Sequence, residues 1–342
     1  MREEPGIPTT ALTECLRQEY ALTITQIEFL PLGADRNTAV YRAVSDEAVP
    51  YFVKLRSGGF DETTVVVPRM LYQQGVSQII PPIPTRSQRL WANLGDLRLI
   101  VYPFVEGRQG YEREITSQHW VELGRALRGI HSAALPPAIT MRVPRETYAS
   151  RWRDIVRRVQ QEISGASYED AVSADFVRLL KLRERETSAL VSGAEQLGAV
   201  LREQPADFVL CHADIHAGNM LIGADDALHI VDWDTLIFAP KERDLMFAGA
   251  GLGGGWHPPD REEALFYQGY GHAEINPVAL VYYRYERIVQ DIAEYCDQIL
   301  STDAAAGAED RSEGLRQLTS QFMPGQVVEI ALRSQRNLPR EL

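Results

Sequence analysis

One polar stretch, framed by apolar runs, constrains this chain more than any other part of its sequence. Residues 207–223 are DFVLCHADIHAGNMLIG, and residues 224–234 continue as ADDALHIVDWD. The alternation of apolar runs and turn-forming residues predicts a strand, a polar loop, and two further strands that pair as a hairpin. Because Asn219 begins the first hairpin strand and Asp232 ends the second, their side chains are expected to lie close together.

The side chains of this loop and hairpin suit a metal site with a further carboxylate, that of Asp214, beside it. Asn219 and Asp232 offer the hard oxygen ligands that Mg²⁺ prefers, and Asp214 lies five positions before Asn219. Taken singly, Asp214 and Asn219 could be turn residues. Asp232 could cap a strand end, and His212 could be a buried, hydrogen-bonded histidine. The ordered set at these intervals favours a functional site.

A second histidine, His216, lies four positions after His212, which is the spacing of metal-binding histidines on a helix. Gly218 and the flanking strands indicate a loop instead, and no third nitrogen or sulfur ligand lies nearby in the sequence, so a zinc site is not expected. His216 is interpreted as a loop residue.

The rest of the sequence divides into a strand-rich part and a helical part. Residues 24–104 contain short β-branched and aromatic runs separated by turn residues, with one expected helix between Asp61 and Gly75. After Thr116, apolar residues recur every three or four positions, which predicts helices. A long helix is expected after Asn276, which can cap it.

This division predicts an α+β fold of two lobes. Residues 1–104 would form a small, antiparallel β-rich N-terminal lobe, and residues 116–342 a larger, mainly helical C-terminal lobe. Residues 105–115 would be the hinge between them. Two such lobes enclose a cleft, which is the usual place for a ligand.

The charge and the cysteine content limit the partners and the location of the protein. The formal net charge of −12 argues against nucleic acid and anionic membranes, which bind basic surfaces, and it is compatible with cationic small molecules. The three cysteines are widely spaced, so neither a disulfide framework nor a zinc site is expected. The first residues lack a signal-peptide pattern and no apolar run approaches bilayer length, which favours a cytoplasmic protein.

Lysine is rare in this chain, so each lysine is of interest. Of 35 basic residues only three are lysines, at positions 54, 181 and 241. Lys54 lies in the expected strand YFVKLRS. Alone it could be an exposed strand lysine, but it could also be a compact point charge that reaches a phosphate group from the sheet.

The order H-x-D-x-x-x-x-N, followed by a hairpin and a further aspartate, resembles the aminoglycoside phosphotransferase and choline kinase branch of the kinase-like fold. Within this branch the segments CHADIHAGNMLIG, IVDWD, APKERDLMF and YERIVQDIA are most similar to the spectinomycin phosphotransferases, and the resemblance extends over nearly the whole chain. It implies a bilobal kinase-like fold, ATP as phosphate donor, Mg²⁺ as cofactor, and phosphorylation of a hydroxyl group.

The resemblance also implies a role for each motif residue. Asp214 would be the catalytic base that orients the substrate hydroxyl and accepts its proton, and His212 would brace the loop. Asn219 and Asp232 would hold Mg²⁺ against the nucleotide phosphates, and Lys54 would contact the inner phosphates.

The signals for nucleotide binding are less specific. The segment PLGADRNTAVYRA resembles the phosphate loop of the family, which would place Gly33, Asp35 and Asn37 beside the nucleotide. It has one glycine where protein kinases have three, and by itself it would indicate only a hairpin turn. The segment YPFVEG resembles the hinge, where the main chain of Phe104 and Val105 would bind adenine.

Two further segments are open to more than one interpretation. Glu62 is the nearest candidate for the glutamate that pairs with Lys54, although Pro68 interrupts the expected helix. The segment GAGLGG at residues 249–254 formally matches a dinucleotide-binding fingerprint, but it follows an expected helix rather than a strand. It is interpreted as a loop that carries Trp256, either a plain linker or a lid over the substrate.

For the acceptor, the resemblance implies spectinomycin, a cationic aminocyclitol that would be inactivated by phosphorylation of one ring hydroxyl. Its ammonium groups need carboxylates, and its fused rings need an apolar wall. The candidate contacts are Asp234, Trp256, Tyr285, Glu286 and Asp291. Asp291 has an alternative partner, since Arg287 lies four positions before it on the same expected helix.

Other acceptors and other classes of protein stay open. The same chemistry could act on choline, homoserine, methylthioribose or a different aminoglycoside. A nucleotide-binding pseudokinase is disfavoured by the intact set Asp214, Asn219 and Asp232, and a dehydrogenase by the missing strand–helix context of residues 249–254. A monomer or a weak homodimer is expected.

Overall fold

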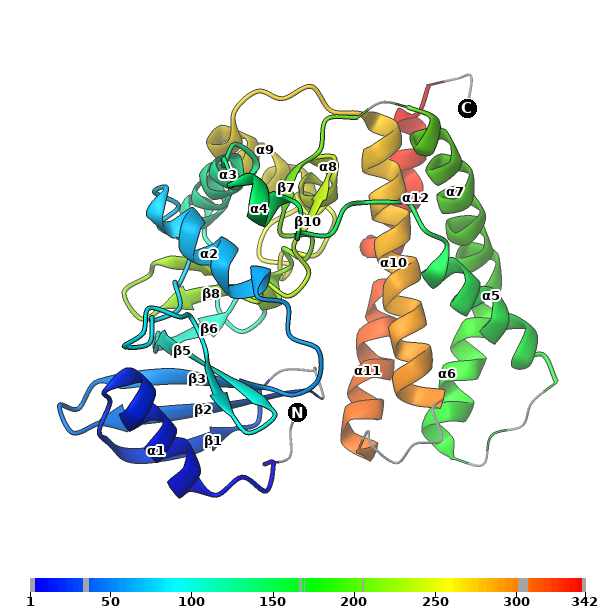
Figure 1. Ribbon diagram of the computed structural model, residues 1–342. Coiled ribbons are helices and arrows are strands. Elements are labelled where there is room, and N and C mark those ends of the chain that lie inside the picture. The colour runs from blue at the N-terminus through cyan, green and yellow to red at the C-terminus, as the bar shows by residue number, and fades with distance from the viewer. Residues whose placement is uncertain are drawn as a thin grey trace.

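The protein folds into a β-rich lobe and a larger helical lobe that lie side by side (Figure 1). The computed structural model describes residues 4–32, 37–165, 168, 170–204, 206–300 and 307–339. The first part of the chain forms α1 (Thr9–Tyr20), β1 (Ile24–Leu30), β2 (Thr38–Ser45), β3 (Pro50–Arg56), α2 (Thr63–Gln73), β4 (Ala92–Leu94), β5 (Leu97–Pro103) and β6 (Gly107–Gln109). The expected kinase-like architecture is confirmed.

An antiparallel sheet in the order β1-β2-β3-β5-β4 forms the small lobe. Side chains alternate between its two faces. One face, with Tyr41, Val53 and Leu99, packs against α1 in a common apolar cluster. Lys54 and Arg56 are even-numbered residues of β3, so they lie on the opposite face from Val53.

Helix α2 joins the small lobe to the core of the large lobe. Its buried residues Val67 and Leu71 belong to the apolar cluster of the helical lobe rather than to that of the sheet. Ile79, which follows the helix, forms a β-bridge with Ile230. The helix expected between Asp61 and Gly75 is thus present, with Pro68 inside it and buried.

The remaining elements make up the helical lobe, together with short strands that lie next to it in the chain. They are α3 (Ser117–His131), α4 (Pro137–Thr140), α5 (Arg151–Glu162), α6 (Ala171–Leu182), α7 (Glu184–Glu203), β7 (Val209–Cys211), η1 (Ala217–Asn219), β8 (Met220–Gly223), β9 (Leu228–Ile230), β10 (Ile237–Ala239), α8 (Glu242–Leu245), α9 (Pro259–Tyr270), α10 (Pro277–Leu300), α11 (Ala308–Gln321), α12 (Val327–Ser334) and η2 (Gln335–Asn337). No helix of the described residues is long and apolar enough to cross a membrane.

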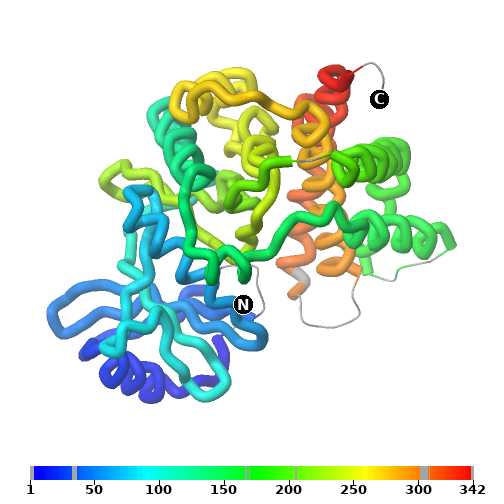
Figure 2. Tube along the Cα trace, turned by 45° about the horizontal axis from the view of Figure 1, so that its top comes forward, coloured from blue at the N-terminus to red at the C-terminus, as the bar shows by residue number. Residues whose placement is uncertain are grey.

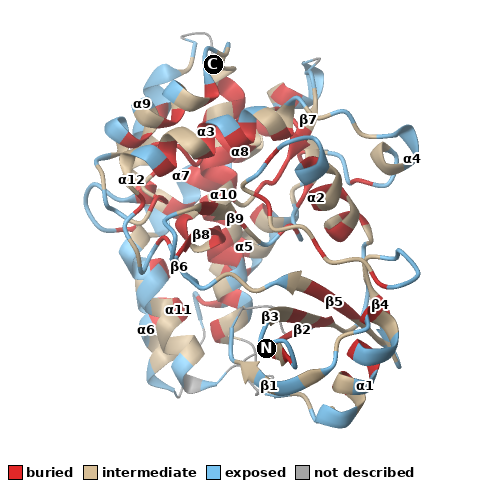
Figure 3. Ribbon diagram, turned by 90° about the vertical axis from the view of Figure 1, so that its left-hand side faces the viewer, coloured by how far each residue is buried: buried red, intermediate tan, exposed pale blue. Residues whose placement is uncertain are grey.

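Helix α10 is the centre of the helical lobe. Figure 1 places it between β7 and β10 on one side and helices α5 and α7 on the other, and in Figure 2 its orange trace again lies beside the green helices. Its residues are buried along most of its length (Figure 3). The expected cap is confirmed, because Asn276 Oδ1 accepts hydrogen bonds from the backbone N–H of Val278 (3.0 Å) and Ala279 (3.3 Å).

Two local predictions from the sequence are also confirmed. Strands β8 and β9 pair as the expected hairpin, with Met220 opposite Ile230. Residues 249–254 follow α8 rather than a strand, and Gly249, Gly251 and Gly254 have positive φ angles. This segment is therefore a glycine-dependent loop and lacks the strand–helix geometry of a dinucleotide site.

Candidate active site

A buried aspartate holds the polar loop that follows β7. The Asp244 carboxylate accepts hydrogen bonds from the backbone N–H of His212 (2.9 Å) and Ala213 (2.6 Å), and its Oδ2 lies 3.0 Å from His131 Nε2. Ala213 has a φ of 69°, a left-handed conformation that a non-glycine residue keeps only where its surroundings hold it. Asp244 therefore fixes the backbone immediately before Asp214.

The ring of His212 links the same loop to the β8–β9 hairpin. Its Nδ1 accepts a hydrogen bond from the backbone N–H of Asp214 (3.3 Å), so the proton lies on Nε2, which donates to the carbonyl oxygen of Val231 (3.0 Å). The ring is fully buried and meets Trp233 edge to face, with 4.6 Å between the centroids. These are contacts that brace a loop.

The Asp214 carboxylate lies between three polar side chains. Its Oδ2 accepts a hydrogen bond from Asn219 Nδ2 (3.1 Å) and lies 3.6 Å from His216 Nε2. Its Oδ1 accepts a hydrogen bond from Arg287 Nη1, which reaches the loop from α10. Burial alone would raise the pKa of Asp214, but the Arg287 guanidinium and His216 hold the pKa well below its usual range. The side chain is 19% exposed, so part of the carboxylate stays open to a ligand.

Asn219 and Asp232, the candidate magnesium ligands, are neighbours across the start of the hairpin. The backbone N–H of Val231 donates to the carbonyl oxygen of Asn219 (3.0 Å). The side-chain Nδ2 of Asn219 donates to Asp214, so its Oδ1 is the amide atom that can act as a ligand. The Asp232 side chain is 53% exposed. These oxygen donors fit the ligands that Mg²⁺ takes.

The two cations of β3 meet a carboxylate of the helical lobe. Lys54 Nζ lies 3.0 Å from Asp234 Oδ2 and 3.9 Å from Asp232 Oδ1, and Arg56 Nη1 lies 2.5 Å from Asp234 Oδ1. Burial raises the pKa of Asp234, but Lys54 and Arg56 outweigh it and lower the pKa. Arg56 was not predicted as a site residue, although its spacing of two from Lys54 on a strand could have indicated it.

Glu62 does not pair with Lys54 in this structure, which corrects the expectation from the sequence. Its Oε2 accepts a hydrogen bond from Arg142 Nη1 (2.9 Å) in the helical lobe. The reason is the position of α2, which packs on the core of the large lobe and carries Glu62 with it. Lys54 takes Asp234 as its partner instead.

The other nucleotide candidates that the structure describes lie next to the ends of strands β2 and β5. Gly33 and Asp35 lie outside the described residues. The carbonyl oxygen of Asn37 accepts a hydrogen bond from the backbone N–H of Ser57 (2.8 Å). Phe104 and Val105 lie in the segment between β5 and β6, after the last residue that pairs with β3.

The acceptor candidates fall into an exposed group and a buried group. Asp234 and Trp256 are exposed, whereas Tyr285, Glu286 and Asp291 are buried. Trp256 Nε1 donates a hydrogen bond to the carbonyl oxygen of Gly110 (2.6 Å). The backbone N–H of Gly110 in turn donates to the carbonyl oxygen of Ala217, three residues after Asp214 (2.8 Å). Trp256 therefore lies beside the loop that carries Asp214.

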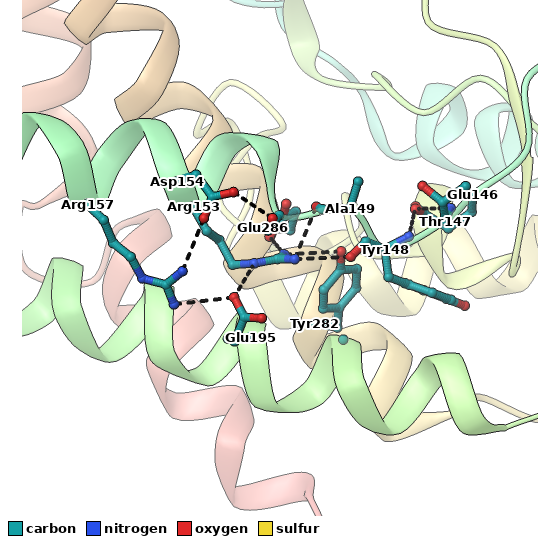
Figure 4. A network of polar contacts seen from close by, with 12 residues as sticks. Glu146, Thr147, Tyr148, Ala149, Arg153, Asp154, Arg157, Glu195, Tyr282 and Glu286 are labelled. Carbon is teal, nitrogen blue, oxygen red and sulfur yellow. Dashed lines mark hydrogen bonds and ion pairs between the residues drawn. The ribbon is translucent and has the colours of Figure 1, made fainter.

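The buried candidates have partners inside the protein. Glu286 Oε2 accepts a hydrogen bond from Arg153 Nη1 (2.5 Å) in the network of Figure 4. Asp291 Oδ1 lies 3.0 Å from Arg287 Nε, which is the alternative intrahelical pair. Tyr285 packs closely on Gly193 of α7. In this structure these side chains do not form the open anionic and apolar wall that the sequence predicted.

A further aromatic pair borders the Asp214 loop and was not predicted. Tyr111 stacks on His216, with 6.0 Å between the ring centroids and 23° between the planes. Tyr111 is 49% exposed. The sequence places this tyrosine in the hinge segment, about a hundred residues before the histidine, so no local pattern could have paired them.

Comparison with known proteins gives a consistent result. Residues 28–280 match the family described as phosphotransferase enzyme family, APH. The chain is 26% identical over 231 residues to protein StrN of Streptomyces griseus, which covers 64% of this chain and 67% of that protein.

Two solved structures are similar over almost the whole chain. The crystal structure of spectinomycin phosphotransferase APH(9)-Ia in complex with ADP and spectinomycin is 36% identical, with a TM-score of 0.89, covering 97% of this chain and 100% of that chain. The AMP-bound complex of the same enzyme has a TM-score of 0.84 and covers 95% of this chain and 98% of that chain.

Proposed function

The chain belongs to the phosphotransferase enzyme family, and from this premise we propose that it transfers a phosphoryl group from ATP to a hydroxyl group of spectinomycin, which inactivates the antibiotic. The observation that carries the proposal is the similarity, over 97% of the chain, to a spectinomycin phosphotransferase in complex with ADP and spectinomycin. Family and fold make the protein a kinase with an alcohol acceptor.

The arrangement around Asp214 supports its role as the group that receives the hydroxyl. With a lowered pKa the carboxylate is ionised at neutral pH, so it mainly orients the hydroxyl and takes its proton as the bond to phosphorus forms. His212 would act only as a brace, because both of its ring nitrogens are bonded within the loop and hairpin.

Two side chains would hold Mg²⁺, and two cations would hold the phosphates. Asn219 and Asp232 would supply oxygen ligands, and Mg²⁺ when bound would offset the charge of the nucleotide phosphates. Lys54 and Arg56 would exchange Asp234 for phosphate oxygens, since all three lie together. The proposed nucleotide contacts of the phosphate loop and hinge are Gly33, Asp35, Asn37, Phe104 and Val105.

The surroundings of the exposed part of Asp214 fit an acceptor with cationic and apolar parts. Trp256 and Tyr111 border the loop that contains His216, and the partly exposed Asp234 carboxylate follows the hairpin in the sequence. A rigid aminocyclitol needs an apolar surface for its rings and anionic groups for its ammonium groups. Because the reaction needs ATP, we propose that the enzyme works in the cytoplasm. We also propose that it is a monomer or a weak homodimer.

The proposal is tested by competition between acceptors. Purified protein receives ATP, Mg²⁺ and equal concentrations of spectinomycin, choline, homoserine, methylthioribose and another aminoglycoside, and the phosphorylated products are identified by mass. We expect phosphospectinomycin to dominate. Asp214→Ala is the control for catalysis at this site, and its turnover should fall by about 10² to 10⁴.

The outcomes separate the acceptor from the chemistry. A dominant product from choline or another alcohol would overturn spectinomycin as the substrate and leave the kinase reaction intact. Consumption of ATP that survives Asp214→Ala would overturn the role of Asp214.

A further inference from the structure

Arg287 is a mostly buried cation that joins two carboxylates at the edge of the candidate active site. From α10, its Nη1 donates a hydrogen bond to Asp214 Oδ1, and its Nε lies 3.0 Å from Asp291 Oδ1. The Arg287 side chain is 13% exposed, and its guanidinium carbon lies 5.7 Å from the centre of the Phe247 ring. A guanidinium held in this way has a fixed orientation, unlike one in a surface ion pair.

The contacts of Asp214 divide its two oxygens between different partners. Oδ1 accepts from Arg287, whereas Oδ2 accepts from Asn219 Nδ2 (3.1 Å) and faces His216 Nε2 at 3.6 Å. A carboxylate bonded at one oxygen can rotate about its last bond, but one bonded at both oxygens has a defined plane. Asn219 and Arg287 together therefore set the direction in which the remaining lone pairs point.

Asp291 is the second carboxylate that contacts Arg287. It lies on α10, four residues after Arg287, and its Oδ2 accepts a hydrogen bond from Gln321 Nε2 of α11 (2.8 Å). The Asp291 side chain is 8% exposed. A continuous chain of contacts thus runs from α11 through Asp291 and Arg287 to Asp214.

We propose that Arg287 is a positioning residue for the transfer reaction: it fixes the plane of the Asp214 carboxylate so that Oδ2 receives the acceptor hydroxyl. The inference rests on the proposed function of Asp214. Effective transfer requires reacting groups within a fraction of an ångström of their productive positions, so a carboxylate that rotates loses rate even when both substrates bind.

The same helix offers a matched control. Arg284 lies three residues earlier on α10 and is buried, and within the described residues its hydrogen bonds go to backbone carbonyl oxygens, those of Met246 (3.5 Å) and Ala248 (3.2 Å). Its removal tests the loss of a buried arginine from α10 without any change at Asp214.

The experiment compares Arg287→Met, Arg287→Lys and Arg284→Met in the full-length protein. For Arg287→Met we expect kcat to fall about 10²-fold, the size of loss that misplacement of a reacting group can cause, with the KM for ATP unchanged. Arg287→Lys keeps the charge but cannot hold both carboxylates at fixed angles, so kcat should recover in part. Arg284→Met should lower thermal stability and leave kcat per folded molecule unchanged.

A double-mutant cycle tests whether the loss of kcat in Arg287→Met arises through Asp214. If Arg287 acts through Asp214, adding Arg287→Met to Asp214→Ala should cause no further loss of kcat. A further loss of the same size in the double variant would overturn the proposal, as would an unchanged kcat in Arg287→Met. If Arg287→Met does not fold, Arg287→Lys gives the same cycle.

The acceptor question is kept separate from this test. The cycle is run with whichever alcohol the competition experiment identifies, so an error about spectinomycin leaves it intact. If Asp214→Ala itself keeps full turnover, the proposed function of Asp214 fails first and the proposal for Arg287 falls with it.

Discussion

Two adjacent residues of α10, Glu286 and Arg287, enter two different buried ion-pair clusters. Glu286 turns toward α5 and α7 and contacts Arg153, whereas Arg287 turns toward the loop after β7 and contacts Asp214, the proposed catalytic base. Helix α10 lies between these two parts of the protein (Figure 1). Both clusters pair an arginine inside the protein with a carboxylate, so the two ion pairs have the same composition.

The difference lies in what each carboxylate still exposes. All three guanidinium nitrogens of Arg153 are bonded inside the protein, to Glu286, Glu195, Tyr282 and the carbonyl oxygens of Tyr148 and Ala149 (Figure 4). The Glu286 side chain is 7% exposed, against 19% for Asp214. The Glu286 carboxylate is therefore nearly closed to a substrate, whereas the Asp214 carboxylate is partly open. Burial and pairing alone therefore do not identify a catalytic residue.

The largest effect is expected from breaking the first cluster. Glu286→Gln removes the charge that compensates the fully buried Arg153, and losing one partner of a buried pair costs about 3 kcal/mol or more of unfolding free energy. The KM for spectinomycin and kcat per folded molecule should not change. Urea unfolding and steady-state kinetics on the same preparation measure both quantities.

Glu195→Gln is the matched variant within that cluster. Glu195 also pairs with Arg153, but its side chain is 38% exposed, so its loss should cost about 1 kcal/mol or less. If Glu286→Gln instead raised the KM for spectinomycin at unchanged stability, Glu286 would belong to the acceptor site, as the sequence indicated.

The sequence predicted the parts of the site that depend on local order. The spacing of His212, Asp214 and Asn219 and the hairpin to Asp232 lie within 21 residues, and the turn chemistry and strand patterns there are strong. The fold followed from the change of period near Thr116 and from the resemblance.

The side-chain partners could not be predicted in the same way. Nothing in the segment around Glu62 shows that α2 packs on the large lobe, so its pairing with Arg142 depends on contacts between distant segments. Arg287 had an obvious partner in Asp291, four residues later, and no local pattern indicated Asp214, 73 residues away, as a second partner. Arg56 was one of many arginines, whereas Lys54 was conspicuous because lysine is rare.

A third carboxyl group, that of Glu262 on α9, differs from those of Glu286 and Asp214 in its pairing within the described part of the chain. Glu262 of α9 is 1% exposed, and no described residue forms a hydrogen bond with its Oε2. Burial raises the pKa of Glu262 to about 8, so it is protonated in the folded protein at neutral pH, whereas in the unfolded chain it ionises above about 4.5. The folded state therefore binds the extra proton, and stability should fall as pH rises from about 4.5 to 8.

The measurement is the free energy of unfolding between pH 5 and pH 7. A single group contributes at most about 1.4 kcal/mol per pH unit, and we expect a loss of roughly 2 kcal/mol over this interval. Glu262→Gln should flatten this part of the profile, because the amide stays neutral in both states. A variant whose profile matches that of the unmodified protein would show that Glu262 is charged, and so paired, in the folded state.

A smaller effect than those of Glu286 and Glu262 is expected where an ion pair is exchanged during the reaction. Arg56 and Lys54 share Asp234, so nucleotide binding replaces one anionic partner by another and the net gain per cation is modest. Arg56→Met should raise the KM for ATP about tenfold, equivalent to about 1.4 kcal/mol, and leave the KM for the acceptor unchanged. Arg89→Met, which removes an exposed charge of the small lobe paired with Glu19, is the control. An equal rise in the KM for ATP in both variants would show that overall charge causes the effect. A rise confined to the KM for the acceptor would show that Arg56 contacts the acceptor rather than ATP.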